Sequence, residues 1–344
     1  MNPTAHVPNV RHSQSGFQRV TDFLRNWTLP VAMLTGGLSY WTYSHIPVFA
    51  STRPFVTKAV AVVQPLLIFM MLFLTFCKVD FRELRLRKWH LWLLLFQGGA
   101  FVFLSILLGF FPDFSAGVIV EGAILCLICP TATAAAVVTA KLNGDSAGLT
   151  AYTLLINLMV ALLVPIFVPL IHPHAELSFL GSFFLIISKV FPLLICPLFA
   201  AVIVRKYCPK THVLLTQHKN LAFYLWAVAL ALAIAVTVRS IVHSHTPFLY
   251  LTGIAAISLI CCIIQFYVGH SIGRHYGCPI GAGQALGQKN TVLAIWMGYT
   301  FFTPVSSIAG GFYSIWHNVY NSWQLYLKRK EKCRAVSDSR AVSS

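Results

Sequence analysis

The sequence predicts an all-α protein that crosses a membrane many times. Of its 344 residues, 57% are hydrophobic and only 10% are charged, and the apolar residues gather in long windows. Soluble domains carry about 25% charged residues, and a helix needs roughly 20 apolar residues to cross hydrocarbon. The stretches between the windows are short, so we expect no separate soluble domain.

Ten apolar windows follow one another along the chain. They cover about 29–47, 58–77, 89–111, 115–140, 147–171, 178–204, 220–242, 247–272, 278–302 and 304–326. The first window is the weakest because it contains Thr35, Ser39 and Thr42, so nine spans remain an alternative to ten.

The N-terminal segment, residues 1–28, is polar and basic. It lacks the short apolar core and small-residue cleavage site of a signal peptide, so the first span would itself direct insertion. Phe17, Val20, Phe23 and Trp27 recur at helical spacing. This spacing predicts an amphipathic helix on the inner membrane face; a plain helical linker is the alternative.

Basic residues cluster in alternate connections between the windows. The clustered residues are Lys78, Arg82, Arg85, Arg87, Lys88, Lys141, Arg205, Lys206, Lys210, Lys219 and Arg274, with more in the tail at 327–344. The other connections hold only Arg53, Lys58 and Arg239. Because basic connections stay in the cytoplasm, we expect a multi-pass protein of the cell (inner) membrane with both termini cytoplasmic. The net charge of +16 then reflects orientation, and nucleic-acid binding is not expected.

Ten spans divide into two sets of five, at 29–171 and 172–326, between the cytoplasmic segments 1–28 and 327–344. Five is an odd number, so the second set must cross the membrane in inverted orientation. Inverted repeats of this kind are typical of secondary transporters.

The fourth span of each set is interrupted. The first interruption reads Cys-Pro-Thr-Ala-Thr at 129–133, and the second reads Gly-Gln-Lys-Asn-Thr at 287–291. Irregular backbone is tolerated at membrane depth only where it lines a cavity or is buried in protein. Two interrupted spans in corresponding places predict a transporter binding site.

Seven residues are candidates for binding a solute or an ion. They are Thr131, Thr133, Gln288, Lys289, Asn290, Thr291 and, in the third span, Gln97. At a broken helix the carbonyl end attracts cations and the N–H end attracts anions. The alternative is that these hydroxyl and amide groups only satisfy the loosened backbone.

Lys289 lies near the centre of its span, where an ammonium needs a carboxylate, carbonyl groups or a bound anion. Glu121 is the only acidic residue well inside a span. It precedes Pro130 by nine residues, about 13 Å along a helix, so a solute anion or the carbonyls of the crossing helix are preferred partners. Glu121 is a candidate proton carrier instead.

We expect no metal or cofactor. Cys126 and Cys129 form a CxxC without a second pair, and His172 and His174 lack cysteine or acidic partners. Lys189 lies in the long sixth window, where snorkelling at the outer interface is the preferred interpretation.

Five patches of sequence resemble the bile acid:sodium symporter family, and they occur in the family's order. They are residues 66–71 with 78–81, Gln97, the CPTATA motif at 129–134 with Gly144-Asp145, residues 287–294, and FYSIWHNVYNS at 312–322. The chain is identified as a divergent, bacterial-type member. This resemblance implies a panel of spans one, two, six and seven against a core of the other six, and sodium-coupled uptake of an organic anion by alternating access.

Several departures from the family pattern argue against sodium coupling. Ala135 and Ala136 stand where relatives carry polar sodium ligands, Ala285 stands in place of a glutamate, and Lys289 replaces a glutamine. We expect the Lys289 ammonium to occupy the place of a coupling sodium. Transport would then be facilitated, or coupled to protons through Glu121.

The sequence therefore predicts a secondary transporter that moves a small or amphipathic organic anion across the lipid bilayer. An enzyme is not expected, because the spans contain no nucleophile with a base and no metal set. The alternatives are a non-transporting receptor or sensor on the same fold, and a fully sodium-coupled symporter. The identity of the anion and the oligomeric state stay open.

Overall fold

The structure is a computed structural model that describes residues 28–79, 84–173, 177–217, 221–244 and 246–343. The first half contains α2 (Thr28–His45), η1 (Pro47–Thr52), α3 (Arg53–Cys77), α4 (Lys88–Phe110), α5 (Gly117–Ile128), α6 (Ala135–Lys141) and α7 (Ser146–Ile171). The second half contains α8 (Phe179–Leu194), α9 (Cys196–Tyr207), α10 (Pro209–Gln217), α11 (Leu221–His243), α12 (Phe248–His275), α13 (Pro279–Gly287), α14 (Thr291–Phe301) and α15 (Ile308–Ser343). The amphipathic helix predicted before residue 28 lies outside the described residues.

The described chain is helical without a named strand, as predicted. Six stretches within it are long and apolar enough to cross a membrane: Pro47–Cys77, Lys88–Phe110, Ser146–Ile171, Phe179–Tyr207, Tyr224–His243 and Phe248–His275. α5 and α14 are shorter apolar helices. These helices confirm the prediction of an all-α, multi-pass membrane protein.

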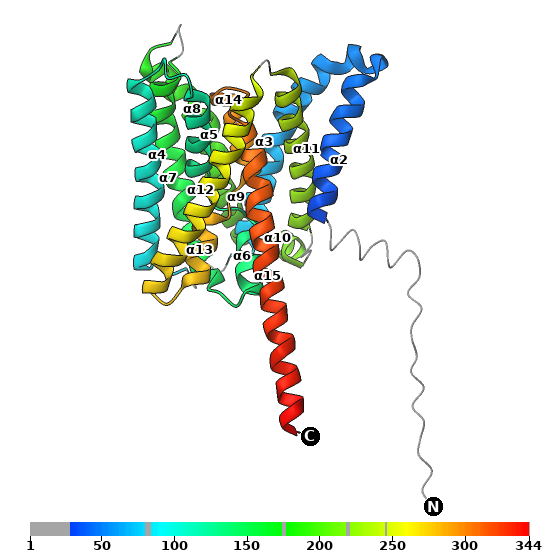
Figure 1. Ribbon diagram of the computed structural model, residues 1–344, viewed down its shortest axis with the longest axis vertical. Helices are drawn as coiled ribbons and strands as arrows, with labels where there is room; N and C mark the ends of the chain where they lie inside the picture. The colour runs from blue at the N-terminus through cyan, green and yellow to red at the C-terminus, as the bar shows by residue number, and fades with distance from the viewer. Residues whose placement is uncertain (1–27, 80–83, 174–176, 218–220, 245, 344) are drawn as a thin grey trace, which may run out of the picture.

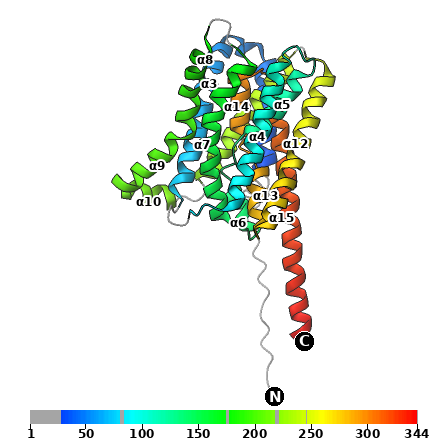
Figure 2. The ribbon, with the colours of Figure 1, turned by 90° about the vertical axis from the view of Figure 1, so that its left-hand side faces the viewer.

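The helices pack into a single bundle (Figure 1). α11 contacts both α2 and α3, and α3 also contacts α9; elsewhere α4 packs on α5 and α7, and α12 packs on α5, α13 and α15. α2 begins at the same end of the bundle at which α15 ends, and α15 projects well beyond the other helices in both views (Figures 1 and 2). The basic tail predicted at 327–344 is therefore, through Ser343, a continuation of α15.

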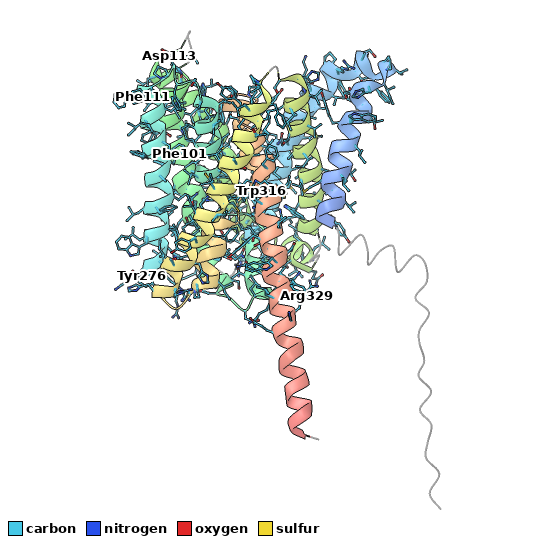
Figure 3. The ribbon with its side chains drawn as sticks, in the orientation of Figure 1. Phe101, Phe111, Asp113, Tyr276, Trp316 and Arg329 are labelled. Atoms are coloured by element: carbon cyan, nitrogen blue, oxygen red, sulfur yellow. The ribbon has the colours of Figure 1, made fainter. Side chains whose placement is uncertain are left out.

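The outward face of α4 illustrates how the bundle suits a lipid environment. Leu95, Phe103 and Phe110 are exposed, whereas Leu93 and Phe101 are fully buried against neighbouring helices. Figure 3 labels Phe101 on α4 and Phe111 at its C-terminal end. Large exposed apolar surfaces are rare on soluble monomers. In hydrocarbon they are in contact with lipid, which agrees with the composition.

The window predicted as one span at about 178–204 corresponds to the apolar stretch Phe179–Tyr207, but the helix within it is divided at Ile195 into α8 and α9. Pro197 stands in the first turn of α9. Proline has no N–H for the helical hydrogen bond, and its ring clashes with the carbonyl one turn earlier. α8 already begins at Phe179, before Lys189, whose Nζ lies 6.0 Å from the ring centroid of Phe301.

Candidate functional site

The two interrupted helices meet inside the bundle. α5 ends at Ile128 and α6 begins at Ala135, while α13 ends at Gly287 and α14 begins at Thr291. Thr131 and Lys289 form an antiparallel backbone bridge. We call residues 129–134 and 288–290 the crossing.

Backbone hydrogen bonds on either side of this bridge join the two segments. The Ala132 N–H donates to the Gln288 carbonyl at 2.8 Å, and the Asn290 N–H donates to the Pro130 carbonyl at 2.9 Å. Asn290 also caps α14, because its side-chain oxygen accepts from the Leu293 N–H at 3.3 Å. The loosened backbone of each helix is thus satisfied in large part by the other helix.

Local sequence accounts for both interruptions. Pro130 cannot continue the hydrogen bonding of α5. At the second interruption, a Cβ added to Gly287 would lie 2.4 Å from the Phe266 ring, so only glycine allows this close approach of α13 to α12.

The carbonyl groups that end α5 all have partners. Gln265 Nε2 donates to Cys126 O at 3.3 Å, Lys289 Nζ to Leu127 O at 3.4 Å, and Gln97 Nε2 to Ile128 O at 3.3 Å and to Cys129 O at 3.0 Å. The end of a helix otherwise leaves such carbonyls unsatisfied. Side chains from α4, α12 and the second interruption therefore replace the missing helical donors.

The end of α13 is satisfied in the same way. The Thr131 hydroxyl donates to Ala285 O at 2.6 Å, and the Tyr313 hydroxyl donates to Gly287 O at 2.8 Å. The Tyr152 hydroxyl in turn donates to Gln97 Oε1 at 2.9 Å. Gln97, a lone polar residue in an apolar span, therefore binds to buried groups of the protein.

Lys289 is 1% exposed, although it carries a long cationic side chain. The Lys289 ammonium donates to the Leu127 carbonyl at 3.4 Å, and within the described ranges no carboxylate lies at ion-pair distance from it. This arrangement matches one of the two partners preferred from the sequence, the carbonyl groups of the crossing helix.

The seven predicted site residues fall into two groups. Gln97, Thr131, Lys289 and Asn290 bind the loosened backbone, which is the alternative role considered for the hydroxyl and amide groups. Thr133 is half-buried, and Gln288 Oε1 is buried without a hydrogen-bond partner among the described atoms. Thr291, which is 5% exposed, begins α14.

Glu121 lies away from the crossing, near the beginning of α5. His172 Nε2 lies 3.2 Å from Glu121 Oε1, and the Thr303 hydroxyl donates to Glu121 Oε2 at 2.7 Å. The His172 ring packs edge-on against Phe302, with ring centroids 5.7 Å apart. The expectation that His172 lacks an acidic partner was wrong, because α5 and the end of α7 come together only in the folded bundle.

A cavity of about 830 Å³ lies between α2, α3, α11 and the connection from α14 to α15. Much of its wall is apolar and includes Val56, Val60, Leu232, Ala235 and Val236. Its volume falls in the range of sites that enclose ligands of drug size.

Two arginines line this cavity. Arg239 Nη1 donates to the Thr57 hydroxyl at 3.1 Å, and Arg53 Nη2 donates to the Ser44 carbonyl at 2.9 Å. In the part of the chain that the structure describes, neither guanidinium has a carboxylate within ion-pair distance. His243 also lines the cavity, with Nε2 2.7 Å from the Tyr40 hydroxyl. The cavity thus combines an apolar wall with two uncompensated positive charges.

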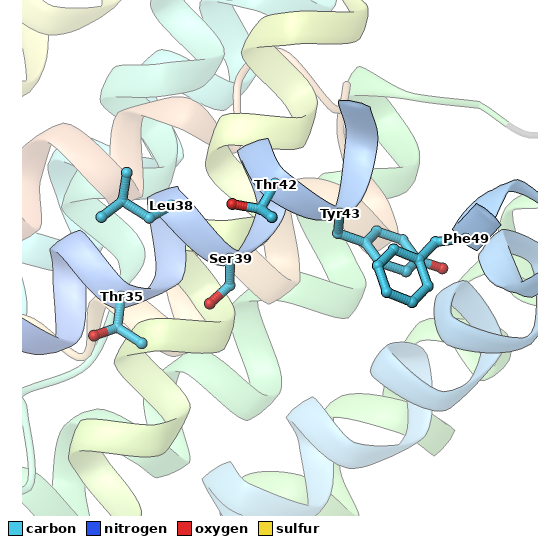
Figure 4. A pocket seen from close by; sticks show the side chains of 6 residues that line it. All are labelled: Thr35, Leu38, Ser39, Thr42, Tyr43 and Phe49. Carbon is cyan, nitrogen blue, oxygen red and sulfur yellow. The ribbon is translucent and has the colours of Figure 1, made fainter. Parts of the chain in front are cut away.

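A second hollow, on the exposed side of α2, shares Ser39 and Tyr43 with the cavity. Figure 4 shows the hydroxyl groups of Thr35, Ser39 and Thr42 along α2 and the ring of Tyr43 beside Phe49. Those two rings stack with centroids 5.5 Å apart. This hollow has no charged lining residue, so it is a weaker candidate for an anion site.

The sequence did not identify Arg53 and Arg239 as site residues. They were considered only as the few basic residues in the connections expected outside the cytoplasm. A signal was present, because Arg239 lies inside the apolar window at 220–242. Intramembrane charges are rare and usually mark functional sites. Arg53, at the beginning of its helix, carried no comparable signal.

Comparison with known proteins gives one family match. Among curated proteins, none matches the chain. A family model described as the sodium bile acid symporter family matches residues 65–244, which is more than half of the chain. The match includes the first interruption and Arg239 and ends before the second interruption. The chain therefore belongs to the sodium bile acid symporter family.

Proposed function

We propose that this protein is a secondary transporter that binds an amphipathic organic anion in the cavity between α2, α3 and α11. The observation that carries the proposal is the pair Arg53 and Arg239 in an otherwise largely apolar cavity. A guanidinium that has no carboxylate partner is suited to a carboxylate, sulfate or sulfonate group, which it binds by charge-assisted hydrogen bonds. The apolar wall of the cavity is suited to contact the hydrophobic part of the same anion.

The architecture that we propose has ten crossings in two inverted repeats, residues 29–171 and 172–326. α2, α15 and the pairs α5–α6 and α13–α14 would supply the four crossings beyond the six long apolar stretches. The meeting of the two interrupted pairs supports this arrangement. Alternating access would move a panel of α2, α3, α8–α9 and α11 against the remaining helices.

We propose that both termini are cytoplasmic and that the protein lies in the cell (inner) membrane. Basic connections stay inside. Lys141, Arg205 and Arg274 stand in the last turns of α6, α9 and α12, and these helices end on the side of the bundle where α15 ends (Figure 1). The cavity, lined by Ser44 and His243 near the opposite helix ends, then opens outward.

We propose further that transport does not require sodium. Sodium prefers oxygen ligands, and the crossing contains no carboxylate. Ala135 and Ala285, which flank the crossing, and Lys289 within it stand where the family resemblance implies a polar sodium ligand, a glutamate and a glutamine. The carbonyl groups at the end of α5 already have donors. This donor set does not fit a sodium ion. Gln288 Oε1 and the Thr133 hydroxyl are the groups left for a solute.

Uptake into proteoliposomes tests the function. A labelled bile acid and a panel of smaller carboxylates and sulfonates would be offered in sodium and in choline buffers. We expect saturable uptake of at least one amphipathic anion, equal in both buffers and lowered at least tenfold at low substrate concentration by Arg239→Gln. Arg274→Gln, at an exposed position in the last turn of α12, is the control and should transport normally.

Three results would contradict the proposal. Tight binding without uptake would indicate a receptor or sensor on the same fold. Chemical conversion of the anion would indicate an enzyme. Steep dependence on sodium would refute sodium-independent transport while leaving the anion cavity in place.

A further inference from the structure

We propose that the Lys289 ammonium serves as a resident cation of the crossing, built into the chain, which holds the carbonyl ends of α5 and α13 together. This inference deepens the proposed function, because it says how the crossing is stabilised without an ion from solution.

The first argument is the burial of an uncompensated charge. Lys289 is 1% exposed, and the titratable side chains that interact with it are the thiols of Cys126, Cys129, Cys261 and Cys262, with no carboxylate among them. An ammonium at mid-membrane is costly unless it has a partner. Thiols do not offset such a cost as a carboxylate would, so the balance must come from the backbone.

The second argument is the field of the two helix ends. Each helix C-terminus carries a partial negative charge, equivalent to about half an electron. Both α5 and α13 end at the crossing, next to the bridge between Thr131 and Lys289. Lys289 Nζ contacts Leu127 O, in the last turn of α5, and Lys289 follows Gln288, the C-cap residue of α13. A positive charge at this point is attracted by both ends.

The third argument is that the cation cannot leave. The residues beside Lys289 are held by hydrogen bonds from Ala132 N to Gln288 O and from Asn290 N to Pro130 O. A dissociable ion would enter and leave with each cycle and couple its gradient to transport. A tethered ammonium stabilises the same carbonyl ends but carries no ion across the membrane.

Chemical rescue of the purified full-length protein tests this role. Lys289→Ala removes the ammonium and leaves space for a small amine. We expect the melting temperature of Lys289→Ala to be lower than that of the wild type and to rise by roughly 2–6 °C in ethylammonium chloride. Tetramethylammonium chloride, which has the same charge but no N–H donors, should not raise it. The wild type should respond to neither salt.

Lys189→Ala is the matched control, because Lys189 is an exposed lysine in another membrane helix. Its melting temperature should not respond to ethylammonium. Lys289→Met fills the space without a charge and should show at least tenfold slower anion uptake, with no recovery in ethylammonium.

The inference is overturned if Lys289→Ala gains no stability from ethylammonium, if tetramethylammonium is as effective, or if sodium alone raises the melting temperature of the wild type. If Lys289→Ala does not fold, anion uptake by Lys289→Met is the test. Uptake by Lys289→Met at the wild-type rate then refutes the inference. Rescue is measured without any substrate. Selective rescue together with absent uptake would therefore refute the transporter proposal and leave the role of Lys289 standing.

Discussion

Thr131 and Lys289 lie opposite each other in an antiparallel bridge, although they belong to different halves of the chain. Each side chain also donates to a carbonyl of the opposite interrupted helix: Thr131 to Ala285 O and Lys289 to Leu127 O. The bridge and the two side-chain contacts form a reciprocal junction between the halves. Changes at this junction should affect both interrupted helices at once.

Gln97→Leu should destabilise the junction. The substitution leaves the carbonyls of Ile128 and Cys129 and the Tyr152 hydroxyl without their partner. Each unsatisfied buried polar group costs about 1–3 kcal/mol of stability. The free energies measured for side-chain hydrogen bonds between membrane helices lie near the low end of this range. We expect a loss of about 2 kcal/mol in thermal unfolding. Gln64→Leu is the control, because the buried Gln64 amide nitrogen has no hydrogen-bond partner among the described atoms, and an equal loss there would contradict the prediction.

Gly287→Ala should disturb the end of α13. The new Cβ would lie 2.4 Å from the Phe266 ring, so the ring or the helix must move. Overpacking of this kind costs about 1–3 kcal/mol, measured as a lower melting temperature. Gly99→Ala is the matched control, since nothing lies within 4 Å of its added Cβ. Helix propensity alone should make Gly99→Ala neutral or slightly stabilising, and the prediction fails if the two variants melt alike.

Local chemistry explains why the interruptions were predictable from sequence and the cavity was not. Pro130 removes a hydrogen-bond donor from its own helix, and polar residues follow it directly in the sequence, so this interruption can be predicted from one segment. Arg53 and Arg239 become neighbours only because α3 and α11 pack together, and no local pattern encodes that contact. The same holds for Glu121 and His172, which come from different helices of the first half.

Family resemblance supplied part of what local patterns could not. The motifs at 66–71, 129–134 and 312–322 predicted membership of the bile acid:sodium symporter family. The match of the family's sequence model to residues 65–244 confirms this membership. They did not predict the division of the sixth window at Ile195, because a proline inside a long apolar run is compatible with a continuous kinked helix as well as with two helices. Packing decides between these outcomes.

Glu121→Gln should remove a response of transport to a proton gradient. If Glu121 carries a proton, outside acid accelerates uptake by the wild type, because the carboxylate then enters the cycle protonated. Glutamine mimics the protonated form permanently, so uptake should become independent of outside pH while exchange of anion for anion persists. The measurement is uptake at several outside pH values with the inside pH held constant. Asp113→Asn, an exposed carboxylate outside the helices, is the control, and an unchanged pH response in Glu121→Gln would remove Glu121 from any coupling role.

Ala235→Trp should block the cavity between α2, α3 and α11. Ala235 contributes to the apolar wall, and an indole group would occupy much of the space meant for the hydrophobic body of the anion. Anion binding is measured through its effect on the melting temperature. We expect the affinity for a bulky anion to fall at least tenfold, while a small carboxylate still reaches Arg53 and Arg239. Ala140→Trp, at an exposed position of α6, controls for the added aromatic surface. If bulky and small anions lose affinity equally in Ala235→Trp, the apolar wall does not select the ligand body, and the two guanidinium groups alone would define the site.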